Sequence, residues 1–513
     1  MGNTIIPFRY KSPEVFIFLY SKLYNDYYKM KKRYIFIIIL FIIYTAVGLI
    51  YSNSQGFWHD EIYTLTFLKG ISPYPFAGNT LENYLNIFQS NDCKNLLNSD
   101  NFINNIYVRI IHEGHAPLYF ILLKLWAIIF GYSELALRSF SLFSGIISLI
   151  ILFRFFQIFI NNQFSLWILI ILILFNPFLF YYFTEARMYS LAFLFSIISF
   201  KYWISYKEHK NFKSFDFLYF VLSTVSLFYT HYYGIFFFFT LLFYDIFKNG
   251  INLKLFHYFF PLLLFSPWFI MIVKQTQLLT HSWTEDSLNI LNSFIEFDKG
   301  ILRLFFLAKP ESNILLPVFS LIFTLILFYY FDFKWRKKFL FICVFSFYFF
   351  QLFIFDSIMN QHSIVVPRYY IFILILFYLA ISKFIDKAPK IIIISLSICY
   401  LSLASYQYYK IFNYSLMPKR MYKELANYID LQHNVDNTII VIEPDYLAFW
   451  GLSYYLKKDF KLISARFLNN IKTDKHLIYI DVMLGDKFSE NKLNTEAQNN
   501  LKLKRFAGLY LYE

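Results

Sequence analysis

Long apolar segments decide what kind of protein this chain can form. The first covers residues 34–51 and reads YIFIIILFIIYTAVGLIY, and segments of similar character recur up to residue 410. About 18 apolar residues are enough for a helix to cross the ~30 Å hydrocarbon core of a bilayer. Of the 513 residues, 58% are hydrophobic and only 16% are charged, whereas soluble domains contain roughly 25% charged residues. The sequence therefore predicts an α-helical polytopic membrane protein.

Positive charge is concentrated in short loops between the apolar segments. The net charge is +14, and the basic loops are 30–34, 207–213, 248–254, 332–338 and 382–390. Lysine and arginine in short loops between spans are typical of loops that stay in the cytoplasm. We therefore expect no nucleic-acid partner. Residues 1–33 are interpreted as a cytoplasmic segment and not as a removable signal peptide.

The positions of the basic loops also predict the number of spans. The candidate apolar segments are 34–51, 116–132, 137–156, 165–183, 187–204, 216–230, 234–247, 255–273, 314–331, 339–355, 369–385 and 390–410. The basic loops all face the cytoplasm only if one early segment does not cross. Segment 116–132 is short and contains Lys124, so we expect an interfacial or re-entrant helix there. About eleven spans then remain. Residues 52–136 become the first outer loop, and the C-terminus lies outside.

The same topology places the other polar clusters on the outer face, next to helix ends. They are HDE (59–61), HEGHAPLY (112–119), TEARMY (184–189), THYYG (230–234) and VVPRYY (365–370). Acids, histidines and arginines that gather at one membrane surface indicate a site with chemistry of its own. This convergence is the main functional signal in the sequence.

Asp60 and Glu61 are the candidate catalytic residues. A carboxylate at the membrane boundary can act as a general base that deprotonates an acceptor hydroxyl as it attacks. The alternative is a solvated acid that caps a short helix, and Asp60 suits the N-cap position. The motif alone leaves both interpretations open.

An anion-binding group is predicted around the TEARMY motif. Glu185, Arg187 and Tyr189 stand at the predicted start of a helix, where the positive end of the helix and the guanidinium favour a phosphate. Arg368 in the VVPRYY motif adds a second guanidinium on the same side. The alternative for the TEARMY motif is a surface pair of Glu185 with Arg187 or a contact with lipid headgroups. Arg368 can likewise be an ordinary anchor at the membrane surface.

Two histidines complete the candidate binding residues, His115 and His231. His115 can face a phosphate or lipid headgroups. Metal ligation is a further alternative for it, although the HEGH spacing is not that of a zinc-binding helix. A divalent metal therefore stays open, and no cofactor is certain.

Residues 413–513 change character and predict a small α/β domain outside the membrane. Residues 421–431 have apolar positions at helical spacing, and 437–443, 460–464 and 475–482 read as short strands. The 34–412 region is the predicted transmembrane domain.

At the level of motifs the sequence resembles the polytopic C-type glycosyltransferases. The motifs are HDE after the first span, GHAPLYFILLKLWAIIFGYSELALRSFSLFSG (114–145), TEARMYSLAF (184–193), THYYGIF (230–236) and PRYYIF (367–372). The group it resembles contains bacterial relatives of the dolichyl-phosphate-mannose–protein mannosyltransferases, including the lipid A aminoarabinose transferases. The resemblance covers roughly residues 30–385.

The resemblance implies a transfer of sugar from a polyprenyl-phosphate carrier outside the cytoplasm. Asp60 matches the family's catalytic acid, and Glu61 is the adjacent acid that assists or binds. His115 matches a position near the carrier phosphate, and Glu185 and Arg187 match the second outer-loop motif. One departure is Ala116, where the family commonly has proline.

Taken together, the sequence predicts a hexosyl- or pentosyltransferase of the bacterial inner membrane that takes part in cell-envelope glycosylation. The acceptor is a hydroxyl of a protein, lipid or polysaccharide, and a single base predicts inversion. A lipid or glycolipid transporter is the alternative from another class, but it would place ionisable residues in mid-span. A scaffold protein would leave the outer polar convergence unexplained.

Overall fold

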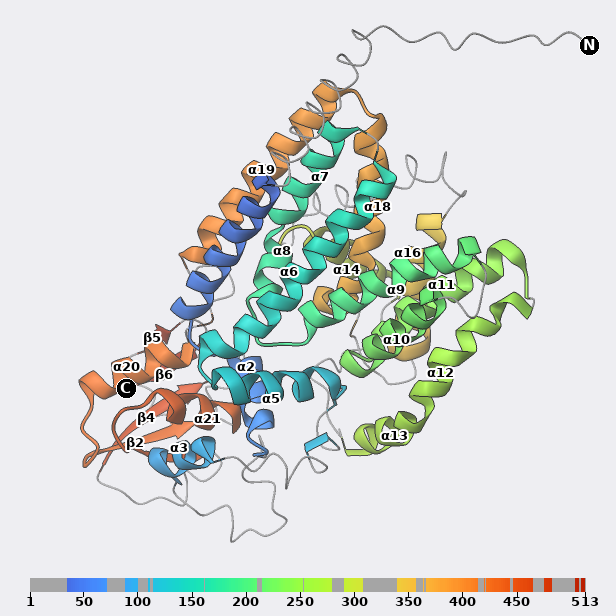
Figure 1. The fold of residues 1–513 in the computed structure, drawn as a ribbon. Coiled ribbons are helices and arrows are strands. Elements are labelled where there is room, and N and C mark those ends of the chain that lie inside the picture. The colour runs from blue at the N-terminus through green and yellow to red at the C-terminus, as the bar shows by residue number, and fades with distance from the viewer. Residues whose placement is uncertain are drawn as a thin grey trace, which may run out of the picture.

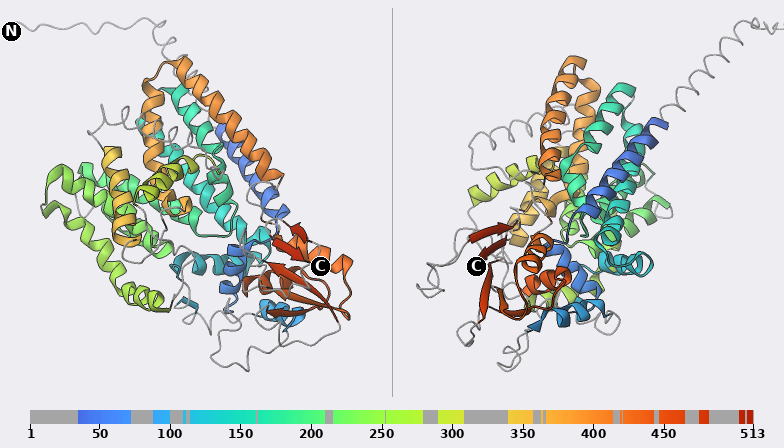
Figure 2. Two further views of the ribbon diagram at one scale, coloured as in Figure 1. Left: turned by 180° about the vertical axis from the view of Figure 1, so that it is seen from behind. Right: turned by 90° about the vertical axis from the view of Figure 1, so that its left-hand side faces the viewer.

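The computed structural model shows a bundle of long helices with a β-sheet at one end (Figure 1). It describes residues 35–71, 88–99, 109–110, 114–160, 162–209, 215–251, 253–278, 290–307, 339–356, 363, 366–413, 419, 421–442, 446–464, 475–481, 503–506 and 509–512. The views in Figure 2 place the sheet and its helices together at one end of the bundle.

The helices are listed here in chain order. The first is Ile35–Ser54, followed by α2 (His59–Leu68), α3 (Ser90–Asn98), α5 (Leu118–Phe130), α6 (Glu134–Phe159), α7 (Gln163–Leu174), α8 (Pro177–Phe183), α9 (Tyr189–His209), α10 (Phe215–Thr230), α11 (Gly234–Asn249), η2 (Leu253–Tyr258), α12 (Phe259–Phe265), η3 (Ser266–Trp268), α13 (Phe269–Leu278), α14 (Ile290–Arg303), α16 (Phe339–Phe349), η4 (Phe350–Asp356), η6 (Pro367–Ile373), α18 (Leu374–Lys387), α19 (Lys390–Phe412), α20 (Met421–Gln432) and α21 (Tyr446–Tyr455).

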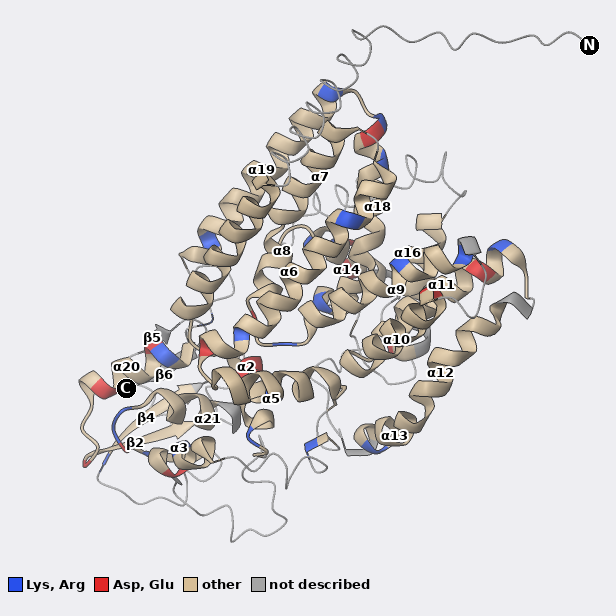
Figure 3. Ribbon diagram, viewed as in Figure 1, with Lys and Arg blue, Asp and Glu red and all other residues tan. Residues whose placement is uncertain are grey.

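The long helices expose apolar side chains in the manner of helices that face lipid. In the first helix Ile42 is 61% exposed, and in α19 Ile391 is 74% exposed. Such surfaces are stable in a bilayer but not in water. Figure 3 shows the long helices almost free of charge along their middles. The chain is a membrane protein with transmembrane helices.

The predicted number of about eleven spans is not confirmed. Among the described residues, five helices are long and apolar enough to cross a membrane, or six if the bent pair α7 and α8 is one span. The predicted spans at 216–230 and 234–247 correspond to α10 and α11, which have only 16 residues each. The predicted span 314–331 lies outside the described residues.

The predicted interfacial segment is a short helix, α5. Its 13 residues give a length of about 20 Å, less than the ~30 Å needed to span. It lies across the direction of α6 at the sheet end of the bundle (Figure 1). Lys124, which suggested an interfacial position, is buried and donates to the Leu68 carbonyl at 2.9 Å. The lysine thus holds the end of α2 and does not face headgroups.

The sheet contains six strands in the order β1-β3-β2-β4-β6-β5. They are β1 (Phe88–Gln89), β2 (Thr438–Ile442), β3 (Lys461–Ser464), β4 (His476–Asp481), β5 (Leu503–Phe506) and β6 (Leu509–Tyr512). The central β2 pairs in parallel with β3 and β4, and all five of its residues are buried. That burial explains why its sequence, TIIVI, is a continuous apolar run.

The first outer loop contributes to this sheet. β1 pairs antiparallel with β3, and Ser90 at the start of α3 donates through its backbone N–H to the Phe460 carbonyl at 2.8 Å. The predicted strands at 437–443, 460–464 and 475–482 coincide with β2, β3 and β4. A separate domain at 413–513 stays a prediction, because an edge strand of the sheet comes from residues outside that range.

Candidate functional site

The site lies where the first helix leads into α2, at the sheet end of the bundle. α2 begins at His59 with Trp58 as its N-cap residue. The alternative interpretation of Asp60 as the N-cap residue is therefore wrong, because Asp60 is already in the first helical turn. Acids in that turn are favoured by the unpaired N–H groups and the positive end of the helix.

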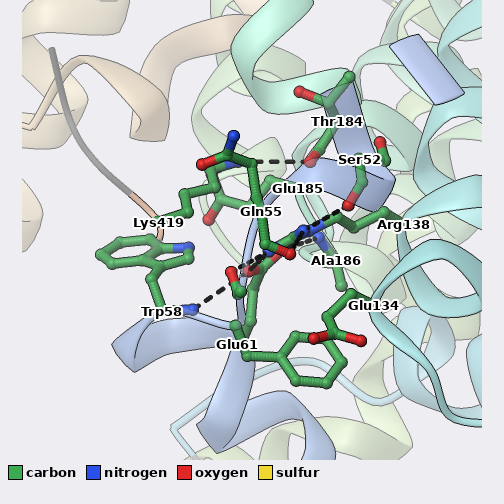
Figure 4. Close-up of polar contacts among 12 residues, drawn as sticks. Ser52, Gln55, Trp58, Glu61, Glu134, Arg138, Thr184, Glu185, Ala186 and Lys419 are labelled. Atoms are coloured by element: carbon green, nitrogen blue, oxygen red, sulfur yellow. Dashed lines mark hydrogen bonds and ion pairs between the residues drawn. The ribbon is translucent and has the colours of Figure 1, made fainter. Parts of the chain in front are cut away.

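Glu61 forms the most tightly bound pair of the site, with Arg138 of α6. The Arg138 Nε donates to Glu61 Oε1 at 2.8 Å and Nη2 to Oε2 at 2.5 Å, and both side chains are fully buried. The same guanidinium also donates to the carbonyls of Ser52, Gln55 and Gly56 at 2.6–3.0 Å. Figure 4 shows this arrangement around Glu61. Arg138 thereby fixes the link between the first helix and α2.

The remaining hydrogen-bonding capacity of Glu61 is also taken up. Its Oε1 accepts from the Ala186 backbone N–H at 2.9 Å, and Oε2 accepts from the Trp58 N–H at 3.3 Å. Burial alone would raise the pKa of Glu61, but the charge and hydrogen bonds of Arg138 outweigh it and lower the pKa below 4.5. Glu61 therefore stays ionised and joins α2, α6 and the loop 184–188.

Asp60 is the acid of the pair that faces the remaining cations. Its Oδ2 lies 3.2 Å from Arg368 Nη1, and the two side chains are 19% and 16% exposed. Arg187 Nη1 lies 3.4 Å from the Asp60 carbonyl oxygen. Burial would raise the pKa of Asp60, but the charges of Arg368 and Arg187 outweigh it and hold the pKa below 3.8. Asp60 is therefore an ionised acid with partial access.

Arg187 is oriented by His115. Its Nη2 lies 3.0 Å from His115 Nε2. Burial, together with the charges of Arg187 and His231, lowers the pKa of His115 well below 6.5, so the imidazole is neutral. Because the guanidinium can only donate, His115 Nε2 accepts and the ring proton is assigned to Nδ1. His115 thus serves as an acceptor for Arg187 and not as a second cation.

His231 and Tyr189 stand beside Arg368. The guanidinium carbon of Arg368 is 5.7 Å from the centre of the Tyr189 ring, and that ring is 5.8 Å from the His231 ring. His231 Nδ1 accepts from the Tyr233 backbone N–H at 3.3 Å. Burial, with the charges of Arg187 and Arg368, lowers the pKa of His231 to about 3. The neutral ring then carries its proton on Nε2, which is buried and lacks a hydrogen bond among the described residues.

Glu185 has a partner that the sequence did not suggest, Lys419. Both side chains are fully buried, with Lys419 Nζ 3.8 Å from Glu185 Oε2. Neither oxygen of Glu185 has a hydrogen bond among the described residues. Burial raises the pKa of Glu185 to about 7, and burial lowers the pKa of Lys419 to about 8. Figure 4 shows the pair next to Glu61.

The structure brings the predicted site residues together at one end of the bundle. Asp60 lies near Arg368 and Arg187, Arg187 near His115, and Arg368 near Tyr189. One local prediction is wrong: Glu185 and Arg187 do not start a helix, because α9 begins at Tyr189. They occupy the preceding loop, 184–188, where the backbone is not helical.

Two charged residues of the site were not predicted, Arg138 and Lys419. Arg138 stands at the beginning of a long apolar segment, and a charge there needs a partner. That signal was available in the sequence. Lys419 lies in a polar stretch between a span and a helix, where a lysine is ordinarily solvated, so no local signal marks it.

No metal centre emerges from these residues. Within the described ranges, no three histidine, cysteine or acidic side chains are grouped so that they could hold a metal ion. His112 and Glu113 of the HEGH motif lie outside those ranges. Metal ligation by His115 stays untested, although its Nε2 lies within hydrogen-bond distance of Arg187.

Comparisons with known proteins find structural similarity only. No family model matches the sequence, and no curated protein matches it. ArnT from Cupriavidus metallidurans in the apo state is 10% identical with a TM-score of 0.42, covering 93% of this chain and 97% of that one. ArnT from the same organism bound to undecaprenyl phosphate is 9% identical, with a TM-score of 0.38 and the same coverage.

An oligosaccharyltransferase from Archaeoglobus fulgidus in the apo form is also similar. It is 11% identical with a TM-score of 0.38, covering 82% of this chain and 64% of that one. These neighbours are C-type glycosyltransferases, the class that the motifs resemble. With identities near 10% and TM-scores below 0.5, the matches say nothing about individual residues of this chain.

Proposed function

We propose that this protein is a membrane glycosyltransferase that moves a sugar from a polyprenyl-phosphate donor to an acceptor hydroxyl on the extracytoplasmic face. The observation that carries the proposal is the convergence of Asp60, Arg187 and Arg368 at the end of an apolar helix bundle. The apolar bundle can accommodate the polyprenyl tail, and the guanidinium groups can bind the phosphate through charge-assisted hydrogen bonds. The carboxylate suits the proton of the acceptor.

The orientation follows from the position of the basic connections. α18 ends at Lys387 and α19 begins at Lys390, while the other end of α19 leads toward the sheet. This basic connection therefore lies at the end of the bundle away from the site. Short basic connections face the cytoplasm, so the site and the sheet face the outside.

Asp60 is assigned as the base because, among the acids that the structure describes, it combines negative charge, partial access and proximity to Arg187 and Arg368. Its lowered pKa makes it a weak base while Arg187 and Arg368 are close. A donor phosphate that takes hydrogen bonds from these guanidinium groups competes with Asp60 for positive charge. Phosphate binding therefore raises the pKa of Asp60 and strengthens the base when the substrate is in place.

The transfer is a single displacement. The acceptor oxygen forms a bond to the anomeric carbon as its proton passes to Asp60, and the bond from that carbon to the phosphate oxygen breaks. The electron pair leaves with the polyprenyl phosphate, whose added negative charge Arg187 and Arg368 offset. Attack from the face opposite the leaving phosphate inverts the anomeric configuration.

The other site residues position these groups. Glu61 cannot act as the base while Arg138 and two backbone N–H groups occupy its oxygens, so we assign it a positioning role. His115 orients Arg187. His231 offers a neutral N–H donor to a substrate oxygen, which can belong to the phosphate or to the sugar.

A deletion strain tests this proposal. Mass spectrometry of its envelope glycans and lipids should reveal one missing sugar, which the wild-type gene restores. Asp60→Asn should fail to restore it at normal protein levels, whereas Asp92→Asn, an exposed acid at the start of α3, should restore it fully. Restoration by Asp60→Asn would remove Asp60 from the role of base.

A further inference from the structure

The C-terminal part of the chain supplies one charge to the buried site. Three acids lie close together there: Asp60 faces Arg368, Glu61 faces Arg138, and Glu185 faces Lys419. The two arginines belong to the helix bundle. Lys419 follows α19, the last of the described span-length helices, and precedes α20. The third pair therefore joins the bundle to the C-terminal part.

Lys419 also binds the end of α8. Its Nζ lies 3.4 Å from the Tyr181 carbonyl and 3.3 Å from the Thr184 carbonyl, and 4.0 Å from the centre of the Tyr181 ring. The last carbonyls of a helix have no partners within the helix, and a lysine there stabilises them. The ammonium thus fixes the point at which α8 ends and the loop 184–188 begins.

That loop carries the groups that the site needs. Ala186 donates its backbone N–H to Glu61, and Arg187 reaches Asp60 and His115. Glu61 therefore holds the loop from the α2 side, while Lys419 holds it from the α8 side. A loop held at Thr184, Glu185 and Ala186 presents the guanidinium of Arg187 in one geometry.

We propose that Lys419 is a positioning residue, which neutralises the buried Glu185 and fixes the loop 184–188, so that the C-terminal part of the chain completes the site. Its role differs from that of a substrate ligand. Lys419 is fully buried, and its ammonium already has acceptors in Tyr181 and Thr184. The consequence for activity rests on the proposed function, whereas the pairing itself does not.

A double-mutant cycle separates the pair from a direct substrate contact. Lys419→Met leaves Glu185 buried beside two other acids without its cation, so its carboxyl group must take up a proton or remain as an uncompensated charge. Removing one partner of a buried pair is far more damaging than removing both. Lys419→Met should therefore reduce restoration of the missing sugar by about tenfold or more. Lys419→Met combined with Glu185→Gln should restore more of the sugar than Lys419→Met alone, because no uncompensated charge remains. The recovery should be partial, because the contacts of Lys419 to the Tyr181 and Thr184 carbonyls are still missing.

The matching measurement is the thermal unfolding midpoint of each purified variant in detergent. The midpoint should fall for Lys419→Met and rise again in part in the double variant. It should stay unchanged for Lys457→Met, because Lys457 is an exposed lysine of the same region. If Lys419→Met does not fold, recovery of folded protein in the double variant reports the same coupling. The thermal unfolding midpoint tests the pairing of Lys419 with Glu185 independently of activity. If the deletion strain has all of its sugars, that result counts only against the proposed function.

Two outcomes would overturn the proposal. A double variant as defective as Lys419→Met would mean that Lys419 does not act through Glu185, and that its contacts to the Tyr181 and Thr184 carbonyls or to the substrate cause the defect. If Lys419→Met unfolds at the wild-type temperature and restores the sugar fully, the pair of Lys419 and Glu185 has no positioning role. Lys419→Arg, which keeps the charge, should retain more restoration than Lys419→Met under the proposal.

Discussion

At the scale of single residues, the site combines two kinds of ionisable group. Asp60 and Glu61 are held ionised by guanidinium groups, with their pKa values lowered. His115 and His231 are held neutral by burial and by the nearby arginines. The site therefore presents fixed charge on its acids and arginines, while its imidazoles act through neutral hydrogen bonds. Such division of roles by environment is typical of catalytic sites.

The neutral state of His231 predicts a pH dependence of stability. Its pKa falls from 6.5 to about 3 on folding, so below pH 6.5 the unfolded chain binds the extra proton. The contribution of His231 is fully present above pH 6.5 and is lost as the pH falls, by at most about 1.4 kcal/mol per pH unit. His231→Gln should therefore show a shallower loss of thermal stability between pH 6.5 and 5 than wild type. Parallel curves would contradict a neutral, buried His231.

Residue identity predicted which side chains gather, but not how they are paired. Asp60, His115, Arg187 and Arg368 were expected on one face because each lies in an outer polar motif. The pairing of Glu61 with Arg138 was not expected. A sequence can show that a buried arginine needs an acidic partner, but it does not show which acid that partner is. Lys419 was missed for a different reason: its burial depends on how the C-terminal part docks.

At the scale of elements, the start of α2 is where the helix bundle contacts the C-terminal part of the chain. The Tyr455 hydroxyl of α21 accepts from the Phe57 N–H at 2.6 Å and donates to Glu134 Oε1 at 2.8 Å. The Tyr422 hydroxyl of α20 lies 3.2 Å from His59 Nδ1. The residues just before and at the start of α2 are thus held from the C-terminal part.

Removal of one hydroxyl tests this link. Tyr455→Phe leaves the buried N–H of Phe57 without this acceptor, which costs about 1–3 kcal/mol. The variant should lower the thermal unfolding midpoint in detergent and reduce transfer severalfold through the displaced start of α2. Tyr454→Phe is the matched control, because the ring of Tyr454 packs on Phe57 and is kept. Equal behaviour of the two variants would argue against a link through the Tyr455 hydroxyl.

Element boundaries were predicted best where periodicity is strong. The helix expected at 421–431 is α20 and the strand expected at 437–443 contains β2. One boundary was predicted wrongly at a polar motif. The helix start was placed at Glu185 and Arg187, whereas α9 begins at Tyr189, because the motif carries no glycine or proline to mark the break. β1 was not predicted, since two residues of a strand leave no periodic signal.

At the scale of the whole molecule, the polar site lies at one end of an apolar bundle and the basic connection of α18 and α19 at the other. A labelling experiment in intact cells tests which end is outside. A cysteine at position 98 in α3 should react with an impermeant thiol reagent, and a cysteine at position 387 at the end of α18 should react only after permeabilisation. Both wild-type residues are exposed. The reverse pattern would invert the orientation.

The central claim is that Asp60 and a donor phosphate share Arg187 and Arg368, and affinity for a short-chain polyprenyl phosphate tests it most directly. Asp60→Asn removes a competitor for the arginines, so this variant should bind the lipid phosphate at least as tightly as wild type while transferring no sugar. Arg368→Met should bind it about tenfold more weakly. If Asp60→Asn binds the lipid phosphate as weakly as Arg368→Met does, the claim is contradicted. Asp60 would then be needed to form the phosphate site and would not compete with the phosphate for the arginines.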